Sequence, residues 1–345
     1  MRPALLLLAS LLLGARPAAT QQAAPALKSY FADAATVREA GVRLIPIKTP
    51  KGEFKVWTKR FGNHPRIKLL LLHGGPGFTH EYFESLEGYL PAEGIEFIYY
   101  DQLGSAFSDQ PKDRDLWTTE RFVEEVEQVR VALGLNKDNF YLLGHSWGGI
   151  LAVEYALKYG ANLKGLVISN MMMSIPDYNR YAEVLARGMD PAVVKEVKEL
   201  EARGQYESPR YMELLIPNFY AKHLCRLPEW PDAVNRAAAR ANKDIYVLMQ
   251  GPSEFGASGR LEQWDRKADL PSLAMPTLVI GGTHDTMDPA HMKWIATQVK
   301  HGSFLLCPKG SHMAMWDDQA TYNQGLIRFL KETDAGRKTV RFGRP

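Results

Sequence analysis

The segment Phe140-Tyr-Leu-Leu-Gly144-His145-Ser146-Trp147-Gly148-Gly149 decides the fold of this chain. A short apolar run ends in the pattern Gly-x-Ser-x-Gly and passes directly into residues 150–157, which have helical character. This order is typical of a nucleophile elbow, a turn so tight that the residues two before and two after the serine must lack side chains. We therefore expect Ser146 at the edge of a buried sheet, with the N–H of Trp147 pointing at the place where an oxyanion forms. Because Gly-x-Ser-x-Gly also occurs in ordinary turns, the rest of the chain has to supply the partners of the serine.

Composition places the chain among ordinary globular proteins. Its 345 residues suffice for one large α/β domain or two small ones, and 46% of them are hydrophobic and 23% charged. The formal net charge of +3 is too small to indicate nucleic-acid binding, and no basic cluster is interleaved with aromatic residues. The two cysteines, Cys225 and Cys307, provide neither a disulfide framework nor a metal-binding pair, so we expect two buried thiols.

The N-terminus has the pattern of a signal peptide over residues 1–22. Arg2 precedes an apolar block at residues 4–13, and a cleavage zone of small residues is expected near residues 19–24. The apolar block is too short for a permanent membrane helix, and no cysteine near the cleavage zone suggests a lipid anchor. We expect export to a periplasm or to the medium, without a stable membrane anchor.

Apolar strands alternate with helices along most of the chain. Segments 42–48 and 52–59, joined by the turn Pro50-Lys51-Gly52, predict an antiparallel hairpin. Further strands are predicted at 67–72, 95–100, 140–143, 163–169, 276–280 and 303–306, and helices at 26–40, 118–133 and about 321–330. This alternation predicts an α/β fold with a mostly parallel sheet and helices on both faces.

Between residues 171 and 269 no buried strand is legible. Helix starts are indicated there by Asp190-Pro191, Ser208-Pro209 and Trp230-Pro231-Asp232. We interpret residues 171–269 as a helical cap inserted over the strand ends. Residues 26–170 and 270–335 then form the core, and residues 336–345 a loose basic tail.

Two side chains further along the chain can complete a catalytic triad with Ser146. A serine hydroxyl needs a base to take its proton, and the base needs a carboxylate to orient it. Asp285 follows the strand predicted at 276–280, and His312 follows the strand predicted at 303–306. Each alone would be taken for a surface loop residue, but together they give the serine, acid, histidine order of this fold. The nearby alternatives are His284, expected to pack or face water, and Asp288, expected in a turn before Pro289.

The glycines after the first buried strand are expected to supply a second oxyanion donor. Gly74 and Gly75 allow backbone N–H groups to approach a substrate without a Cβ in the way. The chain lacks the Gly-Lys-Ser/Thr and Gly-x-Gly-x-x-Gly patterns of nucleotide sites and the His-Glu-x-x-His pattern of metallopeptidases. We therefore expect neither a metal nor an organic cofactor.

Several motifs along the chain together carry a specific resemblance. They are His73-Gly-Gly-Pro-Gly77 with His80 and Tyr82, Asp101-Gln102 with Gly104 and Ser108, Gly144-His-Ser-Trp-Gly-Gly149, Gly251-Pro-Ser-Glu-Phe255, residues 282–285 with Pro289, and Gly310-Ser-His-Met313 with Met315-Trp316. With these motifs, the chain resembles the proline iminopeptidases (prolyl aminopeptidases) of the α/β-hydrolase superfamily over essentially its whole mature length. This resemblance implies an α/β-hydrolase fold with an inserted helical cap, a triad of Ser146, Asp285 and His312, and an oxyanion hole formed by the N–H groups of Gly75 and Trp147.

Glu254 gains a role only from the resemblance. By composition it is a carboxylate in a cap loop, which is most often solvated. In the family, the glutamate of a Gly-Pro-Asn-Glu-Phe segment binds the free α-amino group of the substrate, and Glu254 matches that position. Such a carboxylate would make an acyl hydrolase into an exopeptidase.

Two positions depart from the family pattern. Many members have a second glutamate directly after the catalytic aspartate, where this chain has Thr286, and an arginine where it has Leu103. The first change removes a possible partner of the ammonium group, so the strictness for N-terminal proline stays open. Besides Glu254 and Gly74, the candidates for contacts with the substrate side chain are Phe78, Tyr82 and Trp147.

The leading hypothesis is an exported serine aminopeptidase that removes the first residue, preferably proline, from short peptides or aminoacyl amides with a free N-terminus, through an acyl-enzyme. The alternatives are an amino-acid amidase or arylesterase of the same fold with broader specificity, and a non-catalytic interaction protein on a hydrolase scaffold. Dehalogenases and epoxide hydrolases need an aspartate where Ser146 stands. The oligomeric state is left open.

Overall fold

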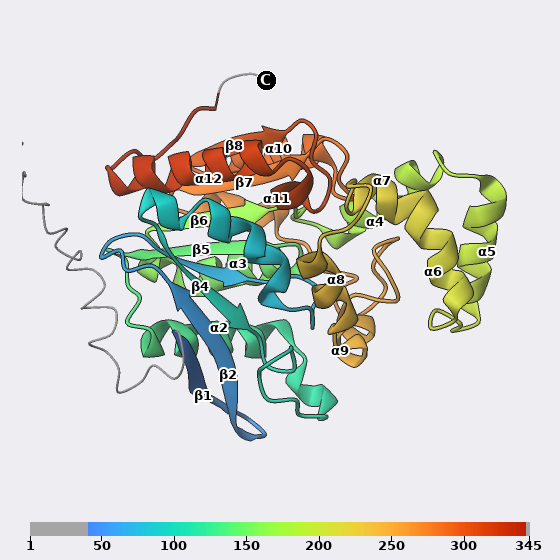
Figure 1. Ribbon diagram of the computed structural model, residues 1–345, viewed down its shortest axis with the longest axis horizontal. Helices are drawn as coiled ribbons and strands as arrows, with labels where there is room; N and C mark the ends of the chain where they lie inside the picture. The colour runs from blue at the N-terminus through green and yellow to red at the C-terminus, as the bar shows by residue number, and fades with distance from the viewer. Residues whose placement is uncertain (1–40, 343–345) are drawn as a thin grey trace, which may run out of the picture.

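The computed structural model describes residues 41–342 and arranges them around one eight-stranded sheet (Figure 1). The strand order is β1-β2-β4-β3-β5-β6-β7-β8; β1–β2 and β2–β4 pair antiparallel, and all other neighbours pair parallel. The strands are β1 Val42–Thr49, β2 Gly52–Phe61, β3 Lys68–Leu72, β4 Glu96–Asp101, β5 Phe140–His145, β6 Gly165–Ser169, β7 Thr277–Gly282 and β8 Gly302–Cys307. The predicted hairpin and mostly parallel sheet are confirmed, so the carboxyl ends of β3 to β8 meet at one edge.

Alternate residues of the central strands point into two separate hydrophobic clusters, one on each face of the sheet. Leu70 and Leu142 pack with α2 (Thr119–Ala132), α3 (Trp147–Tyr159) and α10 (Pro289–Gln298). Leu69 and Leu143 pack instead with α12 (Gln319–Asp334), α11 (Ala314–Asp317) and the 3₁₀ segment η1 (His80–Gly88). The short turns η2 Pro91–Glu93, η3 Arg114–Leu116 and η4 Gly160–Asn162 connect these elements.

The tight turn between β5 and α3 has the expected geometry. A Cβ on Gly144 would lie 1.9 Å from the carbonyl oxygen of Gly148, and a Cβ on Gly148 would lie 2.0 Å from that of Leu72. Between them Ser146 has φ 55°, in the left-handed region that non-glycine residues seldom adopt. The backbone strain therefore sits at the serine itself, as in functional turns of this kind.

Helices connect β6 to β7, and those labelled α4 to α9 lie beyond one end of the sheet in Figure 1. A third hydrophobic cluster lies within this segment, built around residues such as Val197, Tyr211 and Phe219. The helices are α4 Ile175–Ala186, α5 Pro191–Ala202, α6 Pro209–Leu215, the π-helical η5 Ile216–Tyr220, α7 Ala221–His223, α8 Asp232–Ala239, α9 Lys243–Met249 and η6 Lys267–Ser272. The starts predicted at Pro191, Pro209 and Asp232 are thus confirmed, while the division into core and cap domains stays a prediction.

The C-terminal segment differs from the loose tail expected at residues 336–345. Val340 is only 2% exposed, and its N–H donates to Ser303 Oγ at 2.8 Å. The guanidinium of Arg328 lies over the ring of Phe342, which packs against the cluster beneath α12. Val340 and Phe342 are therefore packed against the fold, whereas residues 335–339 are exposed. The signal peptide and the helix predicted at 26–40 lie outside the described residues.

Cys225 and Cys307 are buried free thiols, as expected. Within residues 41–342, no helix combines the length and apolar character needed to cross a bilayer.

Candidate active site

Asp285 and His312 meet at the carboxyl edge of the sheet. Asp285 follows β7, His312 follows β8, and both side chains are buried. Nδ1 of His312 lies 2.8 Å from Oδ1 of Asp285, which also accepts the N–H of Met287 at 3.1 Å. The predicted acid and base are thus brought together by adjacent parallel strands.

The charge of Asp285 governs the imidazole of His312. Burial lowers the pKa of His312, but the charge and hydrogen bond of Asp285, together with the charges of Glu254 and Asp317, hold this pKa above its ordinary value. A carboxylate at Nδ1 places the proton of the neutral ring on that nitrogen, which leaves Nε2 as the acceptor.

Ser146 and His312 line one cavity of about 730 Å³ beneath the helical segment. Glu254, Phe78 and Tyr82 line the same cavity, together with Gly74 and Gly75. Ser146 itself is buried at the start of α3. The structure therefore gathers the predicted nucleophile, base and ammonium partner around one space that is large enough for a small peptide.

Two backbone N–H groups near Ser146 are available to a ligand. Trp147 is the first residue of α3, so its N–H has no acceptor within the helix. Gly75 has φ 108°, and no acceptor for its N–H occurs within residues 41–342. The N–H of Gly74, in contrast, donates to Tyr82 Oη at 2.6 Å. Gly75 and Trp147 thus stay the candidate oxyanion donors.

Tyr82 holds the glycine loop in place. Its hydroxyl accepts from Gly74 and contacts Nδ1 of His145 at 3.1 Å, while Nε2 of that ring contacts the carbonyl oxygen of His312 at 2.9 Å. Burial lowers the pKa of His145 well below its ordinary value, so the ring is neutral and Tyr82 can donate to it. One chain of hydrogen bonds therefore joins the glycine loop, the elbow and the backbone of the candidate base.

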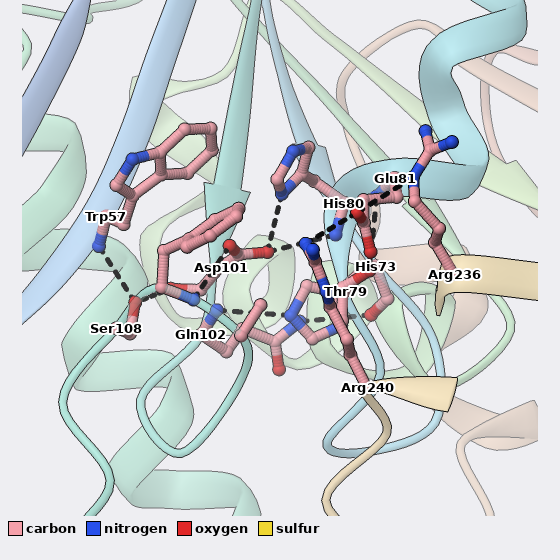
Figure 2. A network of polar contacts seen from close by, with 12 residues as sticks. Trp57, His73, Thr79, His80, Glu81, Asp101, Gln102, Ser108, Arg236 and Arg240 are labelled. Carbon is pink, nitrogen blue, oxygen red and sulfur yellow. Dashed lines mark hydrogen bonds and ion pairs between the residues drawn. The ribbon is translucent and has the colours of Figure 1, made fainter. Parts of the chain in front are cut away.

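A second network behind the loop runs through Gln102 (Figure 2). The N–H of Gln102 donates to Nε2 of His73 at 3.1 Å, and its side-chain amide donates to the His73 carbonyl oxygen at 3.0 Å. Oε1 of Gln102 accepts from the indole of Trp147 at 2.9 Å. Burial lowers the pKa of His73 to about 4, which keeps the ring a neutral acceptor. Gln102 thus fixes the glycine loop and the elbow relative to each other, a role that sequence reasoning did not assign to it.

The side chain of Trp147 is not in the substrate pocket, so that expectation was wrong. Its indole is buried, meets the ring of Phe122 edge-on at 5.5 Å and is absent from the cavity lining. The first residue of a helix can bury its side chain in the layer between helix and sheet while its N–H stays free of helical bonding.

Glu254 is buried, in contrast to the solvated carboxylate that composition alone suggests. It is 8% exposed, and its Oε1 accepts the hydroxyl of Tyr246 at 2.6 Å. Its N–H donates to Tyr220 Oη at 3.3 Å, and Tyr178 Oη donates to its carbonyl oxygen at 2.6 Å. Burial and the nearby carboxylate raise the pKa of Tyr246 well above its ordinary value, so this phenol stays a donor.

No lysine, arginine or histidine within residues 41–342 forms an ion pair with Glu254. A buried carboxylate without a counter-charge is costly, and a cationic ligand in the cavity would relieve that cost. The site thus has the chemistry to recognise an ammonium group.

Thr286 faces the acid–base pair. Its Oγ1 lies 3.2 Å from His312 Nδ1 and 3.3 Å from Asp285 Oδ1, and the residue does not line the cavity. The described residues contain no cluster of three or more His, Cys, Asp or Glu side chains suited to a metal ion. His284 is half-buried, and Asp288 caps α10 by accepting the N–H of Ala290.

Comparisons with known proteins agree with this arrangement. Residues 68–319 match the family model of the alpha/beta hydrolase fold. A proline iminopeptidase of Flavobacterium johnsoniae is 61% identical over 84% of this chain and 98% of its own length, and one of Elizabethkingia meningoseptica is 58% identical over the same shares. The crystal structure of a proline iminopeptidase from Mycobacterium smegmatis superposes with a TM-score of 0.76 at 28% identity, covering 86% of this chain and 99% of that one. The chain therefore belongs to the proline iminopeptidase family of the α/β-hydrolase superfamily.

Proposed function

We propose that this protein is a serine aminopeptidase that hydrolyses the bond after the first residue, preferably proline, of short peptides or aminoacyl amides with a free N-terminus. The observation that carries the proposal is Glu254, a buried carboxylate in the same cavity as Ser146 and His312, for which the described part of the chain provides no cationic partner. The names of the relatives at 61% and 58% identity support the same activity.

The proposed reaction proceeds through an acyl-enzyme. Nε2 of His312 takes the hydroxyl proton of Ser146 as Oγ attacks the scissile carbonyl carbon, and the oxyanion accepts hydrogen bonds from the N–H groups of Gly75 and Trp147. When the C–N bond breaks, His312 gives that proton to the leaving nitrogen, and the shortened peptide departs with a new amino terminus. A water molecule then attacks the ester and passes a proton through His312 back to Ser146, which releases the free amino acid. Asp285 orients the imidazole and offsets its charge throughout.

Free-amine recognition follows from charge and burial at Glu254. An ammonium group placed against this carboxylate forms a charge-assisted hydrogen bond in a site with little water. A blocked amine cannot donate in this way and leaves the carboxylate buried without a partner. The relatives do not favour the amidase or arylesterase alternative, and a substrate panel separates it from the proposal.

The deciding experiment compares arylamides of proline, alanine and leucine with N-acetylprolyl arylamide. The wild type should cleave the prolyl substrate fastest and the acetylated one at least about 100-fold more slowly, the equivalent of one buried charge pair. Glu254→Gln should abolish this preference for a free amine, and Ser146→Ala should abolish turnover. Glu201→Gln is the matched control, because Glu201 also accepts a tyrosine hydroxyl, from Tyr211, but lies outside the cavity. Equal rates on free and acetylated substrates would overturn the proposal.

Export is the second part of the proposal and rests on the pattern of residues 1–22. Expression of the full chain in a bacterial host, followed by cell fractionation and N-terminal sequencing, should give a protein outside the cytoplasm that begins near residues 20–25. A cytoplasmic product with an intact N-terminus would refute it.

A further inference from the structure

Asn170 occupies a constrained position beside the candidate triad. It directly follows β6, is 0% exposed and has φ 52°. Asparagine is one of the few residues with a side chain that adopt this left-handed region readily. Its N–H donates to the carbonyl oxygen of Ile280 at 2.8 Å, so its backbone is tied to the neighbouring strand β7.

The side-chain amide of Asn170 connects the loops that carry the acid and the base. Nδ2 donates to Asp285 Oδ2 at 2.6 Å and to the carbonyl oxygen of Ser311 at 3.1 Å. Oδ1 accepts from Ser169 Oγ at 2.8 Å, and that hydroxyl also contacts Tyr322 Oη at 2.9 Å. Both amide hydrogens and the amide oxygen are thus used. The opposite amide orientation would point an oxygen at two acceptors, so the contacts define which atom is nitrogen.

The two oxygens of Asp285 are therefore held by different partners. Oδ1 faces His312 and the N–H of Met287, whereas the side-chain donor to Oδ2 is Asn170. Without that donor, Oδ2 would be a buried acceptor that has lost a strong bond, and the carboxylate would be held mainly through Oδ1. Ser311 immediately precedes the base, so the same amide also sets the distance between the two loops.

We propose that Asn170 is a positioning residue for the triad, whose amide aligns Asp285 with His312 by bridging the acid to the loop of the base. This inference rests on the proposed serine-hydrolase function, and its test includes a readout that does not depend on the aminopeptidase substrate. Asn170 acts through Asp285, and the residue is not part of the cavity lining.

Asn170→Gly removes the amide but retains a residue that tolerates φ 52°. We expect kcat to fall about 10- to 100-fold, the equivalent of a hydrogen bond to a charged group, with KM changed less than about threefold. The rate of labelling of Ser146 by a fluorophosphonate should fall in parallel. Asn323→Ala removes another buried asparagine amide, which donates to Gln319 in α12, and should leave kcat and the labelling rate unchanged.

Asn170→Asp supplies a second test, because it preserves size while replacing a donor by an added carboxylate. Two buried carboxyl groups this close share one proton, so the variant has a donor to Asp285 Oδ2 only while that proton is held. Its kcat and labelling rate should therefore fall relative to wild type as the pH rises and the shared proton is lost. The other charges that act on His312 are those of Glu254 and Asp317, which both variants leave in place.

The outcomes separate the inference from the proposed function. A wild type that is labelled by fluorophosphonate but cleaves no aminoacyl substrate refutes the aminopeptidase, while the labelling rates of the variants still test Asn170. A folded Asn170→Gly with kcat and labelling rate within threefold of wild type overturns the inference. If that variant does not fold, a kcat and a labelling rate of Asn170→Asp within threefold of wild type at every pH overturn it instead.

Discussion

The hydroxyl of Thr286 lies 3.2 Å from Nδ1 of His312, the same nitrogen that faces Asp285 at 2.8 Å. Thr286 is fully buried and belongs to the surroundings of the acid–base pair rather than to the cavity wall. The residue after the acid is therefore placed to support the imidazole. Because Thr286 does not line the cavity, the proposed recognition of the substrate amine rests on Glu254.

Thr286→Val should distinguish support of the imidazole of His312 from recognition of the substrate amine. The substitution retains the shape of the side chain but removes a weakly placed hydroxyl, so we expect kcat to fall about two- to tenfold, the equivalent of a neutral hydrogen bond. The ratio of kcat/KM for prolyl and N-acetylprolyl arylamides should not change. Thr283→Val, in which an exposed hydroxyl near the same loop is removed, should match wild type. A change in the amine preference of Thr286→Val would show that this residue contacts the substrate amine after all.

The pH dependence should report the balance of forces on His312. The imidazole must be neutral to act as a base, and its pKa is held above the ordinary value by Asp285 against the opposing effect of burial. The value of kcat/KM should therefore fall as the pH drops through a point above about 6.5, the usual histidine value. Asp285→Asn removes the charge and leaves burial dominant, so the acid limb should move to lower pH while kcat falls about 10⁴-fold. An acid limb at the same pH in both proteins would contradict this assignment.

A site residue could be predicted from the sequence when the residues next to it in the chain mark its position. Ser146 was predictable from its own strand and turn, and Asp285 and His312 from the strands that precede them. Asn170 was not, because its importance arises from strand order: β6 lies between β5 and β7, which places the residue after β6 between the elbow and the acid. No pattern along the chain records that adjacency.

The same reasoning explains why the position of the Trp147 indole and the packing of Val340 were not predicted. Trp147 follows the serine in sequence, but the start of a helix directs its indole into the layer between helix and sheet. Val340 lies in a basic segment, yet the open side of the edge strand β8 accepts it.

Ion pairs between η1 and α8 should control access to the cavity. Glu81, whose side chain is 5% exposed, pairs with Arg240 at 2.7 Å and Arg236 at 3.2 Å (Figure 2). Helix α8 also contributes Val234 to the cavity wall, so these pairs tie the wall to the core. Glu81→Gln should raise KM several-fold with a smaller change in kcat, because the cleft loses pre-organisation. Glu332→Gln, which disrupts more exposed pairs on α12, should leave KM unchanged. A KM for Glu81→Gln equal to that of wild type would argue that the helix position does not affect binding.

The cavity wall beside His312 should favour an apolar residue on the leaving side of the scissile bond. The N–H of Met313, the residue after His312, donates to the carbonyl oxygen of Leu224 at 2.8 Å, so Leu224 lies close to the base. Met313, Leu224 and Val234 all line the cavity. His312 must protonate the leaving nitrogen, so the residue that carries this nitrogen departs past that wall.

Dipeptide amides with proline first and glycine, leucine or aspartate second should therefore differ in kcat/KM. Leucine should exceed glycine by about tenfold or more, the discrimination that an apolar pocket gives for a few methylene groups, and aspartate should be cleaved slowest. Val234→Asp should reduce the advantage of leucine, whereas Val184→Asp, at a valine of α4 that is 51% exposed, should not. If glycine and leucine substrates give the same kcat/KM in the wild type, the leaving residue does not contact this wall and must pass toward the open side of the cavity.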